Sequence, residues 1–256
     1  MKAASGRLGI GVGITNSRLA VTKRGIAAEI AAQLGVAINA PVCLIGADPA
    51  DRDVDRQLPR LIAAWGKPTR LELTDGPHHM EVANFARSRV CVASVSDHES
   101  VEMLFPILQA RFRFLIIDAP SRAGFGVGIA DTLLDWLDAL VITTGLGAGE
   151  LAETRRYLER LVALPSAQPV DARVLPIGDP NESGLAPAQL VGRLAALPTI
   201  GRVPRLAGPT AQRNPIGSAS LEAAFRPIVR WIIDGQHHPA SEDHVANRLY
   251  RESSIL

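Results

Sequence analysis

The chain has 256 residues, and 47% of them are hydrophobic, which is enough to bury the core of one large α/β domain. Its 27 basic and 26 acidic residues nearly cancel, which excludes a global field that would attract nucleic acid or anionic lipid. No apolar run approaches the about 20 residues of a membrane-spanning helix, and no charged segment followed by an apolar one opens the sequence, so we expect a soluble cytoplasmic protein.

Short apolar runs alternate with helical stretches along the chain, a pattern typical of a parallel sheet with helices on its faces. The expected strands are 8–15, 42–45, 70–73, 89–94, 114–117, 139–143, 172–177 and 199–203. The expected helices are 26–34, 55–65, 98–111, 149–163, 187–195 and 220–234. We therefore predict an α/β fold with a mostly parallel, twisted sheet of about seven to eight strands and helices on both faces. Residues 1–235 form a single domain, and residues 236–256 form a C-terminal tail.

The first strand, the loop after it and the first helix form the frame in which a phosphate-binding loop would lie. Lys23 aligns with the lysine of the pattern G-x-x-x-x-G-K-[ST], but Ser17 and Thr22 replace the glycines and Arg24 replaces the hydroxyl residue that binds Mg²⁺. Side chains on Leu19, Ala20 and Thr22 disfavour the positive φ that lets a backbone wrap an anion. An ordinary strand-to-helix turn with a solvated lysine is the alternative for this segment taken alone.

Two carboxylates follow other predicted strands. Asp48 ends the segment VCLIGAD, where it can orient Mg²⁺ or water, or act as a turn or helix-capping residue before Pro49. Asp118 ends FLIID, which matches a Walker B-like strand whose carboxylate holds the metal shell. Ligands of open α/β sheets bind at the carboxyl ends of the strands, so both residues are expected at the same edge.

Taken together and in order, these segments resemble the MinD/ParA family, the P-loop ATPases with a deviant Walker motif. The similarity spans roughly residues 7 to 234. It is carried by RLAVTKR with GIAAEIAAQLG, VCLIGADP, IIDAPSRAG, LDALVITTGLG, IGRVPRL, QRNPIG and LEAAFRPIVRWII. The stretch 89–120 looks most like the MinD and TadZ/CpaE branches, whose members place machinery at poles, septa or pili. The resemblance implies a P-loop NTPase fold.

The resemblance also implies roles for individual residues. The family's activating lysine falls on Arg18, its P-loop lysine on Lys23, and its catalytic aspartate on Gly46. The remnant catalytic positions are Arg18, Lys23 and Asp118, and Mg²⁺, if bound, would lie on Asp48 and Asp118. The expected nucleotide-binding residues are Ser17, Arg18, Thr22, Lys23, Arg24, Gly25 and Asn181. Asn181 would be a displaced substitute for the family's asparagine that reads the adenine.

The positions at which this sequence departs from the family pattern affect the expected chemistry of the site rather than the fold. Removal of one electrostatic group from an active site typically costs about 2.7 to 4 kcal/mol of barrier, and at least two such groups are missing. The favoured hypothesis is a degenerate pseudo-ATPase without bound nucleotide. It would act as a scaffold or regulator that positions or assembles a larger cellular machine, as a homodimer or paired with a related ATPase. The alternatives are an active dimerisation switch that uses ATP or ADP with Mg²⁺, and a nonspecific DNA-binding partition protein.

Other polar groups are expected to have structural roles. Cys43 and Cys91 lie in apolar strand-like runs, which indicates buried reduced thiols rather than a disulfide or a metal pair. The arginines of the last helix, Arg226 and Arg230, and the earlier Arg202, Arg205 and Arg213, are expected to pair with acids rather than to hold DNA. The tail carries His237, His238, Asp243 and His244, which we expect to be solvated rather than bound to metal, and it is too weakly apolar and basic to predict membrane binding.

Overall fold

The computed structural model describes residues 9–16, 25–47, 61–75, 78–95, 98–120, 133–134, 136–163, 170–204 and 219–235. Its strands are β1 (Ile10–Asn16), β2 (Val42–Gly46), β3 (Thr69–Asp75), β4 (His78–Phe85), β5 (Val90–Ser94), β6 (Phe114–Asp118), β7 (Ala139–Thr144) and β8 (Asp171–Pro176). Its helices are α1 (Ile26–Ile38), α3 (His98–Arg111), α5 (Ala148–Val162), α6 (Pro187–Ala195) and α8 (Ala219–Asp234), with the 3₁₀ helix η1 (Pro180–Glu182). None of these described helices combines the length and apolar character that crossing a bilayer requires.

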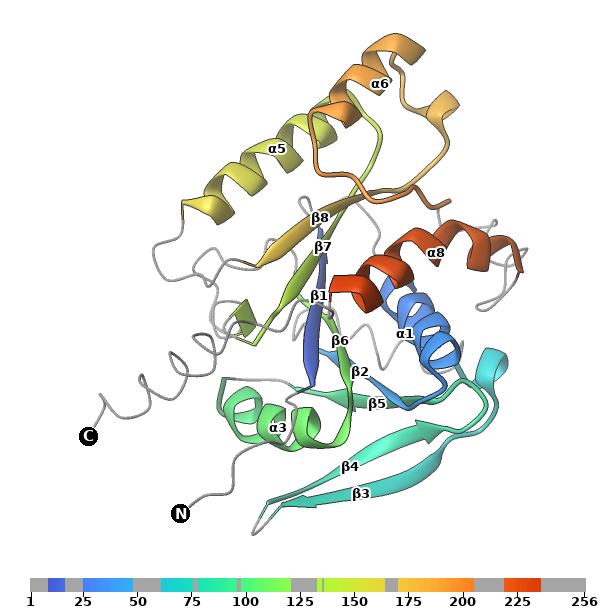
Figure 1. The fold of residues 1–256 in the computed structure, drawn as a ribbon, viewed down its shortest axis with the longest axis vertical. Coiled ribbons are helices and arrows are strands. Elements are labelled where there is room, and N and C mark those ends of the chain that lie inside the picture. The colour runs from blue at the N-terminus through green and yellow to red at the C-terminus, as the bar shows by residue number, and fades with distance from the viewer. Residues whose placement is uncertain are drawn as a thin grey trace.

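The strands form one twisted eight-stranded sheet in the order β3-β4-β5-β2-β6-β1-β7-β8 (Figure 1). All neighbouring pairs are parallel except β3 with β4 and β4 with β5, so β4 is the strand that runs against the others. The predicted α/β class and the mostly parallel sheet are confirmed. Because β1 lies between β6 and β7, its carboxyl end has a parallel strand on each side.

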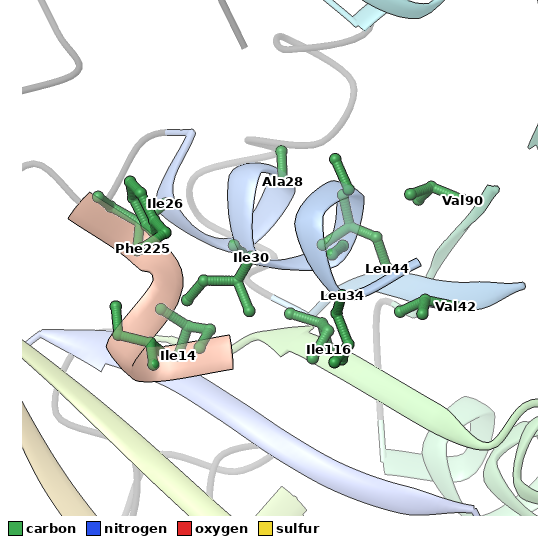
Figure 2. Packing of buried hydrophobic residues seen from close by; sticks show 14 of the residues in the cluster. Ile14, Ile26, Ala28, Ile30, Leu34, Val42, Leu44, Val90, Ile116 and Phe225 are labelled. Atoms are coloured by element: carbon green, nitrogen blue, oxygen red, sulfur yellow. The ribbon is translucent and has the colours of Figure 1, made fainter. Parts of the chain in front are cut away.

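Helices cover both faces of the sheet, as predicted (Figure 1). On one face α1 packs beneath α8, and Ile26, Ile30 and Phe225 join Ile14 of β1 in one buried cluster (Figure 2). On the other face α3 and α5 pack over a second cluster that includes Phe105, Leu115 and Tyr157. The alanine-rich sequence of α1 explains this layering, because small side chains let it lie buried between the sheet and α8.

Strand β1 has one face made of glycine. Gly9, Gly11 and Gly13 alternate with Ile10, Val12 and Ile14, and the apolar side chains point toward α1. A Cβ atom on Gly11 would lie 2.1 Å from the carbonyl oxygen of Trp136. The absence of side chains lets the chain before β7 approach the backbone of β1. There the Gly11 N–H donates to Asp138 Oδ2 at 2.8 Å, and the Asp138 N–H donates to the Gly11 carbonyl at 2.8 Å.

Two predictions about the strands were wrong. Strand β4 was not predicted, and it pairs with β3 in an antiparallel hairpin. The predicted strand 199–203 is present only as two isolated bridges, at Thr199 and Val203. Gly201 has a left-handed φ of 62° and prolines flank the segment on both sides, so a continuous ladder cannot form there. The predicted helix over 55–65 is described only from residue 61 to 65, where it is helical.

The two cysteines are free and buried, which confirms that prediction. Cys43 on β2 and Cys91 on β5 are register partners on adjacent parallel strands, and the Cys91 thiol donates to Asn84 Oδ1 at 3.6 Å. Burial raises the pKa of Cys91 to about 11, and burial together with the nearby Cys91 raises the pKa of Cys43 well above its usual range. Both thiols are therefore protonated and unreactive at neutral pH.

The free energy of unfolding is expected to fall as the pH rises from about 8.5 toward 11, because thiols of the unfolded chain ionise from about pH 8.5 while the buried thiols keep their protons. The unfolded state then binds fewer protons than the native state, so the slope is negative. Urea unfolding measured at several pH values between 8 and 10 tests this. The decline should be shallower in Cys43→Ala and Cys91→Ala, and equal slopes in these variants and in the unmodified chain would contradict the assignment.

Candidate functional site

The carboxyl ends of β1, β2, β6 and β7 meet at one edge of the sheet. In register, Gly46 lies beside Asp118, and Asp118 lies beside Ile14 of β1. On the other side of β1, Asn16 is the register partner of Thr143. This edge therefore gathers residues from four parallel strands around the segment that connects β1 to α1, as expected for the ligand-binding edge of an α/β sheet.

Gly25 is the N-cap of α1 and has a left-handed backbone, with φ 80° and ψ −11°. Glycine adopts this conformation without the steric cost that a side chain brings. The first intrahelical hydrogen bond runs from the Glu29 N–H to the Gly25 carbonyl at 2.9 Å, and Gly25 provides no side-chain acceptor to the N–H groups of the first turn. The helix thus begins after Lys23 and Arg24, whereas a P-loop passes directly into the helix whose N-terminus binds phosphate.

A buried carboxylate lies in the first turn of α1. Glu29 is fully buried, and its Oε1 accepts a hydrogen bond from the side-chain amide of Gln33, one turn further along. A negative charge is stabilised at this position by the positive end of the helix dipole. The first turn of α1 therefore carries a carboxyl side chain that is withdrawn from solvent.

Asp118 is the one predicted carboxylate that the structure places. Its side chain is only 3% exposed, and the backbone around it is fixed on both sides. The Ala47 N–H donates to the Asp118 carbonyl at 3.1 Å, and the Ala119 N–H donates to the Ile14 carbonyl at 3.0 Å. The neighbouring strand presents Gly46 at this level, so no side chain from β2 faces the carboxylate there. The predicted remnant of the Walker B position thus has a firm location at the centre of the edge.

The described residues do not assemble the oxygen ligands of a dedicated metal site. No group of three or more histidine, cysteine, aspartate or glutamate side chains converges within them. Mg²⁺ is usually held by one or two carboxylates together with the phosphates of a substrate. Asp118 supplies one such carboxylate, and the other predicted ligand, Asp48, lies outside the described residues.

A buried chain of hydroxyl groups lies under this edge, and sequence reasoning did not predict it. Thr15 Oγ1 donates to the Pro120 carbonyl at 2.6 Å, and Thr143 Oγ1 donates to the Thr15 carbonyl at 3.0 Å. The Tyr157 side chain, from α5, forms a hydrogen bond with the Thr15 side chain, while burial raises the pKa of Tyr157. These bonds fix the last residues of β1 against β6, β7 and α5, so the loop that follows starts from a rigid position.

A second set of buried hydroxyl groups joins the end of β7 to α5. Thr154 of α5 is buried, and its hydroxyl lies 2.7 Å from the Thr144 hydroxyl and 2.9 Å from the Glu150 carbonyl. Glu150 Oε2 accepts from the Gly147 N–H at 3.0 Å and caps the start of α5. The acidic first turn of this helix therefore has a capping role.

Asn181 lies at the outer side of the edge, beyond β7 and β8. It is exposed on η1, and its N–H donates to Asp179 Oδ1 at 2.9 Å, a turn that sets the backbone after β8. A shallow depression of about 50 Å³ opens beside it, lined by Leu146, Gly147, Glu150, Ile177, Gly178, Asp179 and Glu182. Its carboxylates make it unsuited to an anion. The role of Asn181 in base recognition stays a prediction.

The structure thus places Gly25, Asp118 and Asn181 at one edge of the sheet. Along this edge Asp118 ends β6, the neighbouring strand is β1, and Asn181 follows β8 on the far side of β7. The other predicted site residues, Ser17, Arg18, Thr22, Lys23, Arg24 and Asp48, lie outside the described residues. Of the arginines considered for DNA binding, Arg226 forms an ion pair with Glu222 at 3.7 Å, which confirms the expected pairing for that residue. Arg202 is exposed, and Arg205 and Arg213 lie outside the described residues.

The order of the strands, with β1 between β6 and β7, and the carboxylate at the end of β6 define the fold. The chain is an α/β protein with the architecture of the P-loop NTPases. Its fold is that of the MinD/ParA ATPases, as the comparison with solved structures shows.

Three solved structures illustrate the likeness. MinD in the MinC:MinD cell division protein complex of Aquifex aeolicus superposes with a TM-score of 0.64 at 16% identity, over 88% of this chain and 96% of that chain. The ParA family ATPase of Chlorobium tepidum TLS gives a TM-score of 0.60 at 14% identity, over 89% and 99%. The septum site-determining protein MinD of Pyrococcus horikoshii OT3, complexed with Mg-ADP, gives 0.60 at 13% identity, over 88% and 96%.

No protein-family model and no curated protein sequence matches the chain. At identities this low, the solved structures establish the fold alone. They confirm the fold implied by the sequence resemblance, whereas the chemistry at the edge of the sheet has to be argued from this chain's own residues.

Proposed function

We propose that this chain is a degenerate member of the MinD/ParA type, a pseudo-ATPase that acts as a scaffold or regulator in positioning or assembling a larger cellular machine. The observation that carries the proposal is Gly46. It stands beside the buried Asp118 at the carboxyl end of β2, the position to which the family resemblance assigns the catalytic aspartate. Without that carboxylate, nothing at this position of β2 can handle the attacking water.

One further feature supports a site that turns over slowly or not at all. Arg24 stands where the resemblance requires the hydroxyl ligand of Mg²⁺, and it precedes the left-handed Gly25. Loss of one such group typically costs about 100- to 1000-fold in rate, and two losses that overlap rather than add still leave very slow hydrolysis.

A role in assembly rests on the fold. The Aquifex aeolicus neighbour is a MinD in complex with MinC, and both are named as cell division proteins. By analogy, this chain would act through protein contacts, as a homodimer or paired with a related ATPase that supplies the missing catalytic groups. The competing hypothesis is an active nucleotide switch of the same fold.

Calorimetric titration of the full chain with ATP and Mg²⁺, together with a phosphate-release assay, separates the two hypotheses. The pseudo-ATPase should show no saturable binding up to about 1 mM ATP and no hydrolysis that depends on Lys23 or Asp118. The variants to compare are Lys23→Ala and Asp118→Asn, with Lys67→Ala and Asp234→Asn as controls at exposed positions. Micromolar affinity combined with hydrolysis that both test variants abolish and both controls retain would overturn the proposal in favour of the switch.

A further inference from the structure

Strand β3 forms one edge of the sheet. It pairs with β4 along its length, and no strand of the described residues lies beyond it (Figure 1). An edge strand presents a row of backbone N–H and C=O groups to its surroundings, which makes it a template for another strand. Its seven residues are an ordinary strand length, and the Thr74 carbonyl near its end accepts a hydrogen bond from Arg111 of α3 at 3.3 Å.

The two faces of β3 differ in chemistry. Leu73 is buried in the cluster under α3, while Leu71, on the same face, is 38% exposed. The opposite face carries Arg70 and Glu72, both exposed. Along the edge, β3 therefore combines an incompletely covered leucine with a pair of opposite charges two residues apart.

Two like charges lie opposite each other on this face. Glu72 lies directly opposite Glu81 of β4, and like charges in such cross-strand pairs are destabilising. Arg70 is diagonal to this pair and forms an ion pair with Glu81, with Nε 3.2 Å from Oε1. Within β3 and β4, two carboxylates thus lie beside one guanidinium, so a second cation beside Glu72 would be favourable.

Symmetry limits how β3 can pair with the same strand of a second copy. In an antiparallel pair, residues directly opposite each other must both face the partner or both face away. Along one edge of a strand, the backbone groups of successive residues point alternately toward the partner and away from it. A two-fold axis between two residues would place a residue that faces the partner opposite one that faces away, so the axis must pass through a residue. An axis at Arg70 or Glu72 would place identical charges opposite each other. An axis at Leu71 places Arg70 opposite Glu72 of the second copy, twice, and Leu71 opposite Leu71.

We propose that β3 pairs antiparallel with β3 of a second copy of this chain, about a two-fold axis at Leu71, so that the two sheets become continuous. Main-chain hydrogen bonds supply the attraction in such strand addition, and the side chains fix the register. Arg70 of the second copy offsets the repulsion between Glu72 and Glu81, and the Leu71 pair extends the apolar face. This pairing uses none of the residues at the carboxyl edge of the sheet, so it does not rest on the proposed function.

Charge exchange tests the pairing, with the full chain in sedimentation velocity without nucleotide. The unmodified chain should form dimers, and Arg70→Glu and Glu72→Arg should each raise the dissociation constant by about tenfold or more, because both symmetric ion pairs become like-charge pairs. An equimolar mixture of the two variants should associate as the unmodified chain does. In the mixed dimer, the two introduced side chains face each other as an ion pair, and so do the unchanged Glu72 of one variant and the unchanged Arg70 of the other. The variant that carries both substitutions should also dimerise.

Folding provides an independent readout. Glu72→Arg places an arginine opposite Glu81, so thermal unfolding should be unchanged or shifted upward even though dimerisation is weakened. If Glu72→Arg lost the dimer only because the variant was less folded, its unfolding temperature would fall, and the proposal would be overturned. The proposal would also be overturned if the unmodified chain stayed monomeric at all concentrations or if the mixture of the two variants did not associate. Binding of extended peptides of other proteins to β3, without pairing between two copies, would overturn it as well.

Cross-linking tests the position of the axis. Leu71→Cys places a thiol next to its own copy, at a Cα separation of about 4.5 to 5.5 Å that a disulfide can bridge. Mild oxidation should convert this variant into a covalent dimer at protein concentrations where Ile62→Cys, a control that is also 38% exposed, stays monomeric. Equal cross-linking of the two variants would contradict an axis at Leu71.

Discussion

Replacing Gly11 by alanine is expected to lower the free energy of unfolding by about 3 kcal/mol, at the upper end of the usual cost of overpacking. The added Cβ would lie 2.1 Å from the carbonyl oxygen of Trp136, a backbone atom that cannot rotate away. Relief would require β1 to separate from the segment before β7, which would break the two hydrogen bonds between Gly11 and Asp138. Guanidinium unfolding followed by circular dichroism measures the change.

Gly13→Ala is the matched control for that experiment. Its Cβ would meet Leu137 Cδ1 at 2.6 Å and Leu140 Cδ1 at 2.9 Å, the far ends of side chains that can rotate. We expect a smaller loss, about 1 kcal/mol, because the clash can relax. The entropic benefit of replacing a glycine in a strand applies equally to both variants, so it cancels in the comparison. If the Gly11 variant were as stable as the Gly13 variant, the contact with the Trp136 carbonyl would not be the reason that position 11 requires glycine.

Replacing Phe225 by alanine is expected to cost about 3 to 5 kcal/mol of unfolding free energy. The ring is fully buried on α8 and lies beside Ile26, at the start of α1 (Figure 2). Because α1 is packed between α8 and the sheet, the cavity cannot close without moving one of the two helices. Urea unfolding monitored by fluorescence gives the free energy.

The control for the α8 experiment is Val191→Ala on α6. Val191 is 67% exposed, so its truncation should change the stability by no more than about 0.5 kcal/mol. A loss below about 1 kcal/mol for the Phe225 variant would mean that α8 does not share the core with α1.

The sequence predicts the parallel part of the sheet well because those strands are buried on both faces and appear as continuous apolar runs. The runs that became β2, β6 and β7 are of this kind. Strand β4 reads HHMEVANF, in which Met80 and Val82 alternate with Glu81, but Asn84 then takes the next apolar position and Phe85 is buried out of phase, so the period-2 signal is short. An edge hairpin with one solvated face gives a weaker pattern than a central strand.

The candidate site was predictable only in part, for a similar reason. Asp118 ends an apolar strand, and a carboxylate at that position is a local signal. The bond between Tyr157 and Thr15 depends on how α5 packs against β1, two segments far apart in the chain. Glu29 follows a helical pattern in which nothing distinguishes a buried carboxylate from a solvated one. Contacts fixed by tertiary packing leave no signature in a short window of sequence.

The fixation of β1 at both ends has a mechanical consequence. Near its start, Gly11 exchanges hydrogen bonds with Asp138, and at its end Thr15 is bound to Pro120, to Thr143 and to Tyr157. A strand anchored in this way behaves as a stationary support rather than as a lever. Because α1 shares an apolar cluster with α8, we expect a displacement at the start of α1 to be felt by α8 rather than by β1.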